Sequence, residues 1–248
     1  IILKNCVLFL CKNKLISNVL IVDNSHSQVF NWLEDFDEKI KYHHTKGNNL
    51  GYGKAHNLSC SILKLSKYHI IVNPDIIFVD DECIEKLFLC MESNSEIGLI
   101  QPLISSYPDG SIQKLCKKNP TLLIQLIRGF ANTFIRKIRF LKEYNSWYEM
   151  DKIAYGKEIV DTEYLSGCFM FCRVKILNKI GWFDKRYFMY LEDADLTRSL
   201  SKYSRCVHIP SIEVRHVWGK GSHKNIFLKI IAIQSFILYS LKWGLKIF

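Results

Sequence analysis

The feature that most constrains the fold of this chain is an alternation of short β-branched runs with amphipathic helical segments. Residues 18–25 (NVLIVDNS) form an apolar run that ends in Asp, Asn and Ser, a pattern typical of a buried strand followed by a turn. Similar runs at residues 68–81 and 96–105 are separated by helical patterns at residues 51–65 and 81–93. Strands that alternate with helices favour an α/β fold, so we predict a mixed, mostly parallel sheet flanked by helices.

The chain is expected to form one large domain with a short tail. Its 248 residues, 48% of them hydrophobic, are enough to bury a single core. We predict one domain over residues 1–224 and a C-terminal amphipathic helical tail over residues 225–248. Within the domain, residues 120–155 are basic and aromatic with weak periodicity, and we interpret them as an inserted helix and loop. Within this insert, Arg136, Lys137, Arg139 and Lys142 sit among apolar residues.

The tail leaves two interpretations open. Its apolar run between Lys229 and Lys242 is shorter than the roughly 18 residues of a membrane span. On a continuous helix, Lys242 and Lys246 would share an arc with Lys220 and Lys224, whereas Lys229 would not. The tail would then lie on an anionic membrane surface with its lysines at the interface, or it would pack on the domain.

Charge and cysteine content narrow the class of partner. A net charge of +10 predicts an acidic partner, such as nucleic acid, an anionic membrane or a phosphorylated small molecule. No nucleic-acid recognition motif is present, so we expect no nucleic-acid partner. The nine cysteines include no CxxC pair, which favours reduced cysteines in a cytoplasmic protein.

Polar residues follow two of the predicted strands. Asp23 ends the first run and Asp75 lies in the sequence NPD, after the run that begins at Tyr68. Ligands of open α/β sheets bind beyond the carboxyl ends of the strands, although an aspartate at such a place is often only a turn former. Between them, the loop NLGYGKAHN contains Gly51 and Lys54, which could bring backbone N–H groups and a positive charge to a phosphate.

An acidic cluster follows an aromatic run in YFMYLEDADL, residues 187–196. If a helix begins near Leu191, its dipole favours Glu192 and Asp193 in the first turn. Successive helical residues differ by about 100°, so Glu192, Asp193 and Asp195 cannot all lie on one face. At most one or two of them can point into a cleft, where a carboxylate could act as a general base.

Five motifs in this order resemble the family 2 glycosyltransferases, inverting enzymes of the Rossmann-like GT-A fold, in their bacterial rhamnosyltransferase-like branch. They are VDNS, NLGYGKAHN, NPD, DGSIQKLCKKNPT and the segment from SGCFMF through GWFDKRYF to LEDADL, and HVWGKGSHK follows them. The resemblance covers about residues 19–224. Family members normally begin with a strand before the first helix, whereas this chain opens inside what looks like that helix. We therefore expect the first strand to be missing here and a neighbouring strand edge to be open.

The resemblance implies a donor site and a metal. Asp23 would hold the nucleobase or ribose of a nucleotide-diphosphate sugar, and Asn49 and Gly51 would line the nucleotide pocket. Asp75 would bind Mg²⁺ or Mn²⁺, which suits carboxylate and phosphate oxygens. His216 would be a further metal ligand or a diphosphate contact, unless it is structural. NPD lacks the first acid of the family's metal motif, so the metal would rest on fewer charges.

The resemblance also implies an acceptor site. Asp193 would remove the proton of the acceptor hydroxyl, and Glu192 would orient the acceptor. Gly167 would allow close approach of the sugar or simply close strand packing, and Trp182 would floor the acceptor site or belong to the core. Asp195 would stabilise the local structure.

The function implied is sugar transfer to a growing surface glycan. The sugar, rhamnose in the branch that the chain resembles, would pass from a nucleotide-diphosphate donor to a hydroxyl of a polyprenyl-diphosphate-linked glycan. Such an acceptor suits a cytoplasmic enzyme that is peripheral at the inner face of the plasma membrane. The alternative is a non-catalytic subunit that binds a nucleotide sugar or acts as a scaffold in polysaccharide synthesis. A scaffold has no need to keep the pair Glu192 and Asp193, which favours the enzyme.

Overall fold

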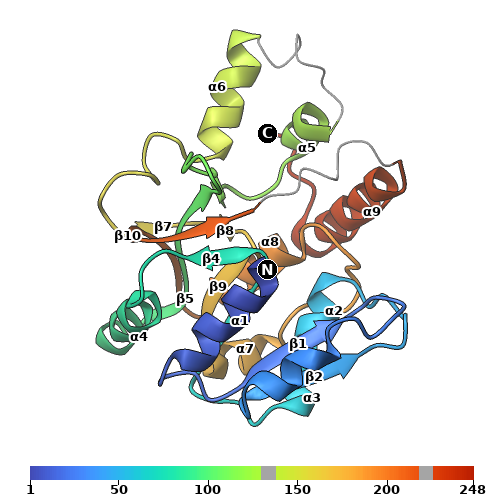
Figure 1. The fold of residues 1–248 in the computed structure, drawn as a ribbon. Coiled ribbons are helices and arrows are strands. Elements are labelled where there is room, and N and C mark those ends of the chain that lie inside the picture. The colour runs from blue at the N-terminus through green and yellow to red at the C-terminus, as the bar shows by residue number, and fades with distance from the viewer. Residues whose placement is uncertain (130–137, 218–225) are drawn as a thin grey trace.

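The fold is centred on a six-stranded mixed sheet, shown in the computed structural model of Figure 1, which describes residues 1–129, 138–217 and 226–248. β5 and β10 run parallel, whereas β9, β4 and β7 each pair antiparallel with their neighbours. The sheet is thus mixed as predicted, but it is less parallel than predicted because short return strands separate or flank the parallel ones. In sheet order the strands are β3 (Tyr68–Val72), β9 (Phe169–Arg173), β5 (Ile97–Ser106), β10 (Arg205–His216) and β4 (Ile76–Phe78), with β7 (Val160–Asp161) on β10.

Strands β1 (Val19–Asp23) and β2 (Ile40–His44) form a separate parallel pair. Within the described part of the chain, β1 pairs only with β2, and β3 pairs only with β9. The facing edges of β1 and β3 therefore carry unpaired backbone groups, and an apolar cavity lies between them. A 3₁₀ helix, η1 (Asn31–Phe36), connects β1 to β2.

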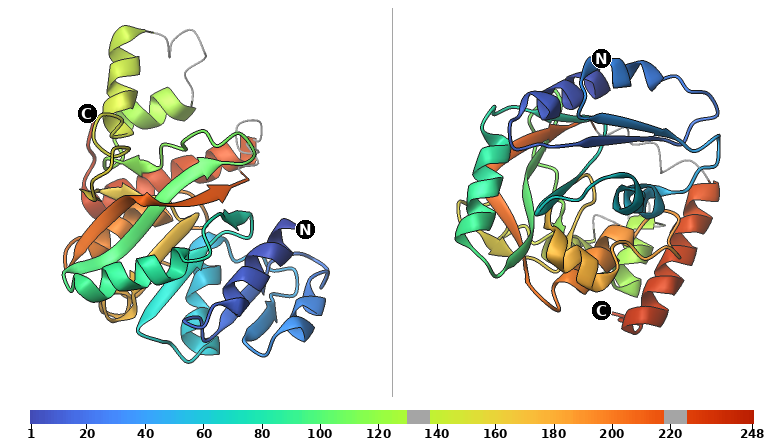
Figure 2. Two further views of the ribbon diagram at one scale, coloured as in Figure 1. Left: turned by 60° about the vertical axis from the view of Figure 1, so that its left-hand side comes forward. Right: turned by 90° about the horizontal axis from the view of Figure 1, so that it is seen from below.

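Helices cover both faces of the main sheet, as Figure 2 shows from two further sides. On one face α1 (Ile2–Lys12) and α4 (Cys83–Ser93) pack with the sheet in a cluster that includes Leu10, Leu87 and Val207. On the other face α7 (Val174–Ile180) and α8 (Glu192–Leu200) share a second cluster that includes Leu177, Leu196 and Met170. Helices α2 (Tyr52–Asn57) and α3 (Ser59–Ile62) follow the glycine loop.

The inserted middle segment forms helices beside a small antiparallel sheet of β6 (Cys116–Lys117) and β8 (Tyr164–Leu165). α5 (Leu122–Gly129) and α6 (Arg139–Tyr148) pack on each other through Ile124, Ile127 and Tyr148. The predicted basic residues Arg136 and Lys137 lie outside the described residues, whereas Arg139 is exposed and pairs with Glu143.

The tail forms one long helix, α9 (Ile226–Trp243), which packs one face on the domain. Ile231, Ser235 and Tyr239 are buried on that face, while the remaining faces are largely apolar and exposed. By length and composition the helix could cross a membrane, since it has 18 residues with a mean hydropathy of 1.5, although the sequence analysis judged the run too short. Of the predicted lysine arc, Lys242 is tied to the domain by ion pairs and Lys246 lies beyond the end of the helix. Lys220 and Lys224 lie outside the described residues.

Candidate active site

The three acids at the start of α8 have three different surroundings. Asp193 is partly exposed, whereas Glu192 is 6% exposed and Asp195 is 2% exposed. The preceding residue, Leu191, takes a left-handed conformation (φ 61°), which turns the aromatic run sharply into the helix. Of the three, Asp193 is therefore the carboxylate that can meet a solute.

Hydrogen bonds from the backbone orient the Asp193 carboxylate. The N–H of Gly167 donates to Oδ2 and the N–H of Ala194 donates to Oδ1, both at 2.9 Å. Gly167 leaves no room for a side chain, since an added Cβ would lie 3.0 Å from the Tyr52 ring. The hydroxyl of Tyr52 in turn donates to the carbonyl of Gly167. Of the two roles considered for Gly167, close packing is the one that these contacts support.

Glu192, the neighbour of Asp193, is buried. Burial, followed by the nearby charge of Asp193, raises the pKa of Glu192 to about 8. One carboxyl oxygen, Oε2, is buried and has no hydrogen-bond partner among the described residues. A neutral carboxyl accounts for both facts, because an ionised one would be left unpaired inside the protein. Its enclosure does not support the expected contact between Glu192 and an acceptor.

Asp75 and His216 face each other across the ends of β4 and β10. Oδ1 of Asp75 lies 3.2 Å from Nε2 of His216. The amide nitrogen of Gln113 donates to Ser106 Oγ and to the carbonyl of His216, so its oxygen faces His216 Nδ1 at 3.0 Å. That contact places the proton of a neutral imidazole on Nδ1 and leaves the Nε2 lone pair directed at Asp75.

Asp75 and His216 supply part of the ligand set that a divalent cation needs. A metal-bound histidine usually donates its other N–H to a fixed acceptor, and Gln113 supplies one here. Among residues 1–129, 138–217 and 226–248 there is no group of three or more His, Cys, Asp or Glu side chains that could hold a metal. Two protein ligands agree with a cation that takes its other ligands from phosphate and water.

A backbone hydrogen bond links the segment that contacts Asp193 to the segment that contains Asp75. Cys168 follows Gly167, and its carbonyl accepts the N–H of Asn73 at 2.9 Å. Asn73 lies two residues before Asp75, and its side-chain amide reaches His216 Nε2 at 3.5 Å. The structure thus brings the predicted base and the predicted metal ligands to one edge of the sheet.

Asp23 is fixed at the end of β1. Burial raises its pKa, but hydrogen bonds from the Tyr42 hydroxyl at 2.6 Å and from Ser25 outweigh that effect, so its pKa falls below the usual range. An ionised Asp23 with these two donors is a rigid acceptor beside the cavity mouth.

The glycine loop is held by contacts that differ from those predicted. The N–H of Gly51 is bonded to Asn49 Oδ1, and the N–H of Tyr52 is bonded to the carbonyl of Phe188. These two donors are therefore unavailable to a phosphate, and Lys54 is exposed on the following helix. Gly51 has φ 77°, and a Cβ there would collide with Phe188. The loop thus docks on the aromatic run that precedes the acids.

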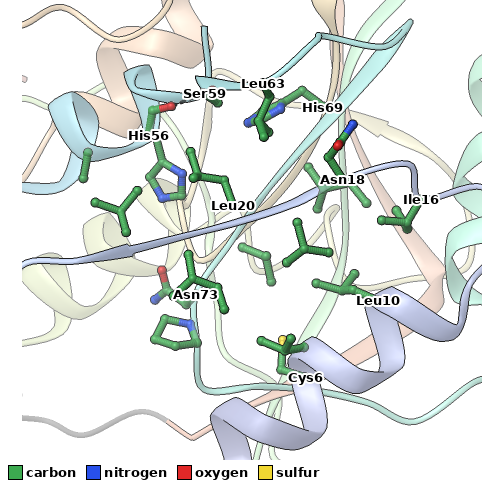
Figure 3. A pocket seen from close by; sticks show the side chains of 18 of the residues that line it. Cys6, Leu10, Ile16, Asn18, Leu20, His56, Ser59, Leu63, His69 and Asn73 are labelled. Carbon is green, nitrogen blue, oxygen red and sulfur yellow. Dashed lines mark hydrogen bonds between the residues drawn. The ribbon is translucent and has the colours of Figure 1, made fainter. Parts of the chain in front are cut away.

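The cavity between β1 and β3 has a volume of about 580 Å³ (Figure 3). Its walls are mostly apolar, with Cys6 and Leu10 from α1, Leu20 from β1 and Leu63 before β3. Its polar lining includes Asn24, Asn49 and Asn73. The polar part of the cavity therefore includes Asn49, and Gly51 also lines the cavity; both were predicted to line a nucleotide pocket.

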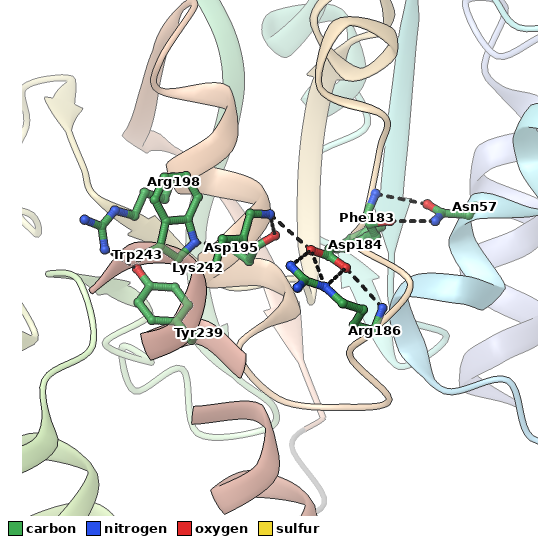
Figure 4. A network of polar contacts seen from close by, with 9 residues as sticks. All are labelled: Asn57, Phe183, Asp184, Arg186, Asp195, Arg198, Tyr239, Lys242 and Trp243. Atoms are coloured by element: carbon green, nitrogen blue, oxygen red, sulfur yellow. Dashed lines mark hydrogen bonds and ion pairs between the residues drawn. The ribbon is translucent and has the colours of Figure 1, made fainter. Parts of the chain in front are cut away.

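Asp195 connects the acidic helix to the tail, as Figure 4 shows. Its carboxylate accepts Lys242 Nζ at 2.8 Å and Trp243 Nε1 at 2.7 Å. Lys242 also pairs with Asp184, which is bound to Arg186. Stabilisation of the local structure was the role expected of Asp195, and the structure shows that its partners come from α9.

Trp182 is part of the core and does not line the acceptor side. Its indole is 7% exposed, donates to Asn178 and packs edge-on against His69. Of the two roles considered for Trp182, its burial supports the core, because the turn after α7 directs the ring inward. Most of the predicted loop after His216 lies outside the described residues, which stop at position 217 and resume at position 226.

Sequence reasoning missed several residues that fix the site. Gln113, Tyr164 and Lys117 lie in or near β6 and β8, whose two-residue strands have no periodic signal. Gln113 and Lys117 do lie inside the quoted motif DGSIQKLCKKNPT, which was the available hint.

The chain is similar to two curated rhamnosyltransferases, while no protein-family model matches it. It is 30% identical over 181 residues to the N-acetylglucosaminyl-diphospho-decaprenol L-rhamnosyltransferase of Mycobacterium tuberculosis, covering 68% of this chain and 56% of that protein. It is 24% identical over 241 residues to the rhamnosyltransferase WbbL of Escherichia coli K12, covering 92% of this chain and 79% of that protein. The chain therefore spans little more than half of the mycobacterial relative.

Among solved structures, the chain is similar to GalNAc-T7 crystallised with UDP, GalNAc and Mn²⁺. The TM-score is 0.57 at 11% identity, over 82% of this chain and 38% of that one. At this level of identity the likeness concerns the fold.

Proposed function

Because this chain belongs to the rhamnosyltransferase-like family 2 glycosyltransferases of the GT-A fold, we propose that it transfers a sugar from a nucleotide-diphosphate donor to a hydroxyl of a lipid-linked glycan. The reaction is a single displacement that inverts the anomeric carbon. We assign the role of general base to Asp193.

The observation that carries the proposal is the setting of Asp193. It is the most exposed of the three acids, two backbone N–H groups fix its carboxylate, and a short chain of hydrogen bonds leads from it to Asp75 and His216. A base held in this way keeps lone pairs for an incoming hydroxyl, and its orientation does not change on binding.

Asp75 and His216 would hold a divalent cation together with the donor diphosphate. Bound there, Mg²⁺ or Mn²⁺ supplies positive charge that stabilises the departing diphosphate. The Mn²⁺ in the GalNAc-T7 structure supports a divalent metal in this fold. Asn49 and Gly51 would contact the nucleotide at the polar part of the cavity, and Asp23 would do so from between the lining residues Val22 and Asn24.

The protein's own residues would move one proton. The acceptor oxygen forms a bond to the anomeric carbon while the bond from that carbon to the diphosphate oxygen breaks. The hydroxyl proton passes to Asp193, and the electron pair leaves with the nucleoside diphosphate. Neutral Glu192 next to the base adds no second negative charge to repel that diphosphate.

The acceptor and the location follow from the relatives and the tail. The name of the mycobacterial relative includes a diphospho-decaprenol acceptor and L-rhamnose, which supports a polyprenyl-diphosphate-linked acceptor and a rhamnosyl donor for this chain. The exposed apolar residues of α9, which include Phe227, Ile237 and Leu241, suit an anionic membrane surface at the cytoplasmic side.

The test replaces Asp193 with asparagine, with Asp81→Asn as a surface control. We expect transfer from a panel of nucleotide-diphosphate sugars to a polyprenyl-diphosphate-linked acceptor to fall by about 10³-fold in Asp193→Asn. Nucleotide binding measured by calorimetry should change less than about twofold. Equal transfer in both variants would refute the base, and binding without transfer by the unmodified chain would favour the non-catalytic subunit.

A further inference from the structure

Lys117 is a buried cation that the reaction described above does not use. It is 9% exposed and stands opposite Tyr164 in the β6–β8 pair, with Nζ 4.7 Å from the centre of the Tyr164 ring. In the part of the chain that the structure describes, no carboxylate forms an ion pair with Lys117, and no hydrogen bond involves its Nζ. Its neighbour Lys118 is different, because it pairs with Glu163 at 3.0 Å.

The charged groups near Lys117 include Asp193, the proposed base. Burial and then the repulsion of Arg128 lower the pKa of Lys117 to about 8, while Asp193 and Glu149 act in the opposite direction. Arg128 is itself paired with Glu149 at 2.6 Å. Burial, followed by the nearby charge of Asp193, raises the pKa of Tyr164, whose ring lies beneath Nζ, well above its usual value. The Lys117 side chain is therefore largely buried near Asp193, and no carboxylate among the described residues forms an ion pair with it.

Such an arrangement is costly unless an anion completes it. Removing a charged group from water without a partner destabilises the folded state, and a phosphate oxygen would provide the missing charge and hydrogen bonds. We propose that Lys117 binds the diphosphate of the lipid-linked acceptor, next to the hydroxyl that Asp193 deprotonates. This rests on the proposed function, because in that acceptor the anion lies one sugar ring from the attacking oxygen.

The surrounding surface suits the lipid end of the same acceptor. The N–H groups of Leu122 and Leu123, at the start of α5, donate to the carbonyls of Lys246 and Ile247 in the tail. Leu126 on α5 and Leu245 in the tail are exposed by 48% and 58%. An isoprenyl chain that leaves the Lys117 site can thus meet apolar surface next to α9.

The first experiment compares Lys117→Met with Lys118→Met, a matched change at the residue that directly follows β6. The assay uses two acceptors, a synthetic sugar linked to lipid by a diphosphate and the octyl glycoside of the same sugar. In Lys117→Met we expect KM for the diphosphate acceptor to rise at least tenfold, with KM for the octyl glycoside and for the donor within twofold of the unmodified chain. Lys118→Met should change none of them. An equal loss with both acceptors, or a raised donor KM, would overturn the proposal.

A second experiment needs no turnover, so it separates this inference from the proposed function. Farnesyl diphosphate and farnesol are titrated calorimetrically into the unmodified chain and both variants. We expect farnesyl diphosphate to bind the unmodified chain and Lys118→Met alike, at least tenfold more weakly to Lys117→Met, and farnesol to show no such difference. Thermal melting should show that Lys117→Met is as stable as the unmodified chain or more so, since a buried charge has been removed. Unchanged binding, or a lowered Tm, would refute the site.

Discussion

Replacing Glu192 with glutamine tests whether the buried carboxyl group of Glu192, next to Asp193, is neutral. The pKa of Glu192 is raised from 4.5 to about 8, chiefly by burial and then by Asp193. Between these two values the unfolded chain has lost its proton while the folded chain retains it. The unfolded state then binds fewer protons, so the free energy of unfolding falls as pH rises through this window.

The size of the effect follows from the shift. Each pH unit well inside the window lowers the free energy of unfolding by about 1.4 kcal/mol, so a change from pH 5.5 to 7.5 removes about 2 to 3 kcal/mol. Glutamine has the shape of the neutral acid but cannot ionise. The stability of Glu192→Gln relative to the unmodified chain should therefore rise by about 2 to 3 kcal/mol over these two units.

The assay is urea unfolding at pH 5.5, 6.5 and 7.5, with the stability difference between variant and unmodified chain taken at each pH. Taking the difference cancels the titration of the other groups. Glu158→Gln, which removes an exposed carboxylate, is the control and should give a constant difference. Transfer activity of Glu192→Gln should stay within about tenfold, because the amide replaces a neutral group. A difference that is constant within about 0.5 kcal/mol across the range would refute a neutral Glu192.

Three further predictions concern the metal, the tail and the membrane. Asp75→Asn should abolish the dependence of donor binding on Mn²⁺, measured by calorimetry with and without chelator, and an unchanged dependence would exclude Asp75 as a ligand. Asp195→Asn should lower the free energy of unfolding in urea by about 2 to 3 kcal/mol, which is less than for a fully buried pair because the Lys242 side chain is 28% exposed. The same variant should let protease remove α9, and a tail that stays intact would contradict the role of Asp195 in holding it. Ile237→Asp with Leu241→Asp, on the exposed face of α9, should lower sedimentation with anionic vesicles at least tenfold while Tm stays constant, and equal sedimentation would refute membrane contact there.

The sequence predicted the elements whose patterns are local. The runs around β1, β3, β5 and the helix α4 have clear periodicity, and each formed near its predicted place. β10, the longest strand at 12 residues, was missed because Pro210 and the polar residues around it interrupt the alternation. The structure accommodates that interruption as a register shift between Ile209 and Glu213.

The candidate site was predictable only where a residue type suggested its own chemistry. Asp193, Asp75 and Asp23 could be singled out because acids at strand and helix ends are recognisable in a sequence. Lys117 could not, since lysine is usually exposed and the sequence shows neither its burial nor its missing counter-ion. Trp182 kept two interpretations at the sequence level, because an aromatic residue fits a sugar site and a core equally well until the turn that directs its ring is known.

The acidic cluster is tolerated because its three carboxylates are separated by environment. Burial raises the pKa of Glu192, the Asp195 carboxylate pairs with Lys242 and accepts the Trp243 N–H, and the partly exposed Asp193 carboxylate accepts two backbone N–H groups. The repulsion expected from three acids within four positions is thereby reduced to one free negative charge. Since Asp195 lies two residues from the base and is held by α9, any movement of the tail at a membrane would act directly on the helix that carries Asp193.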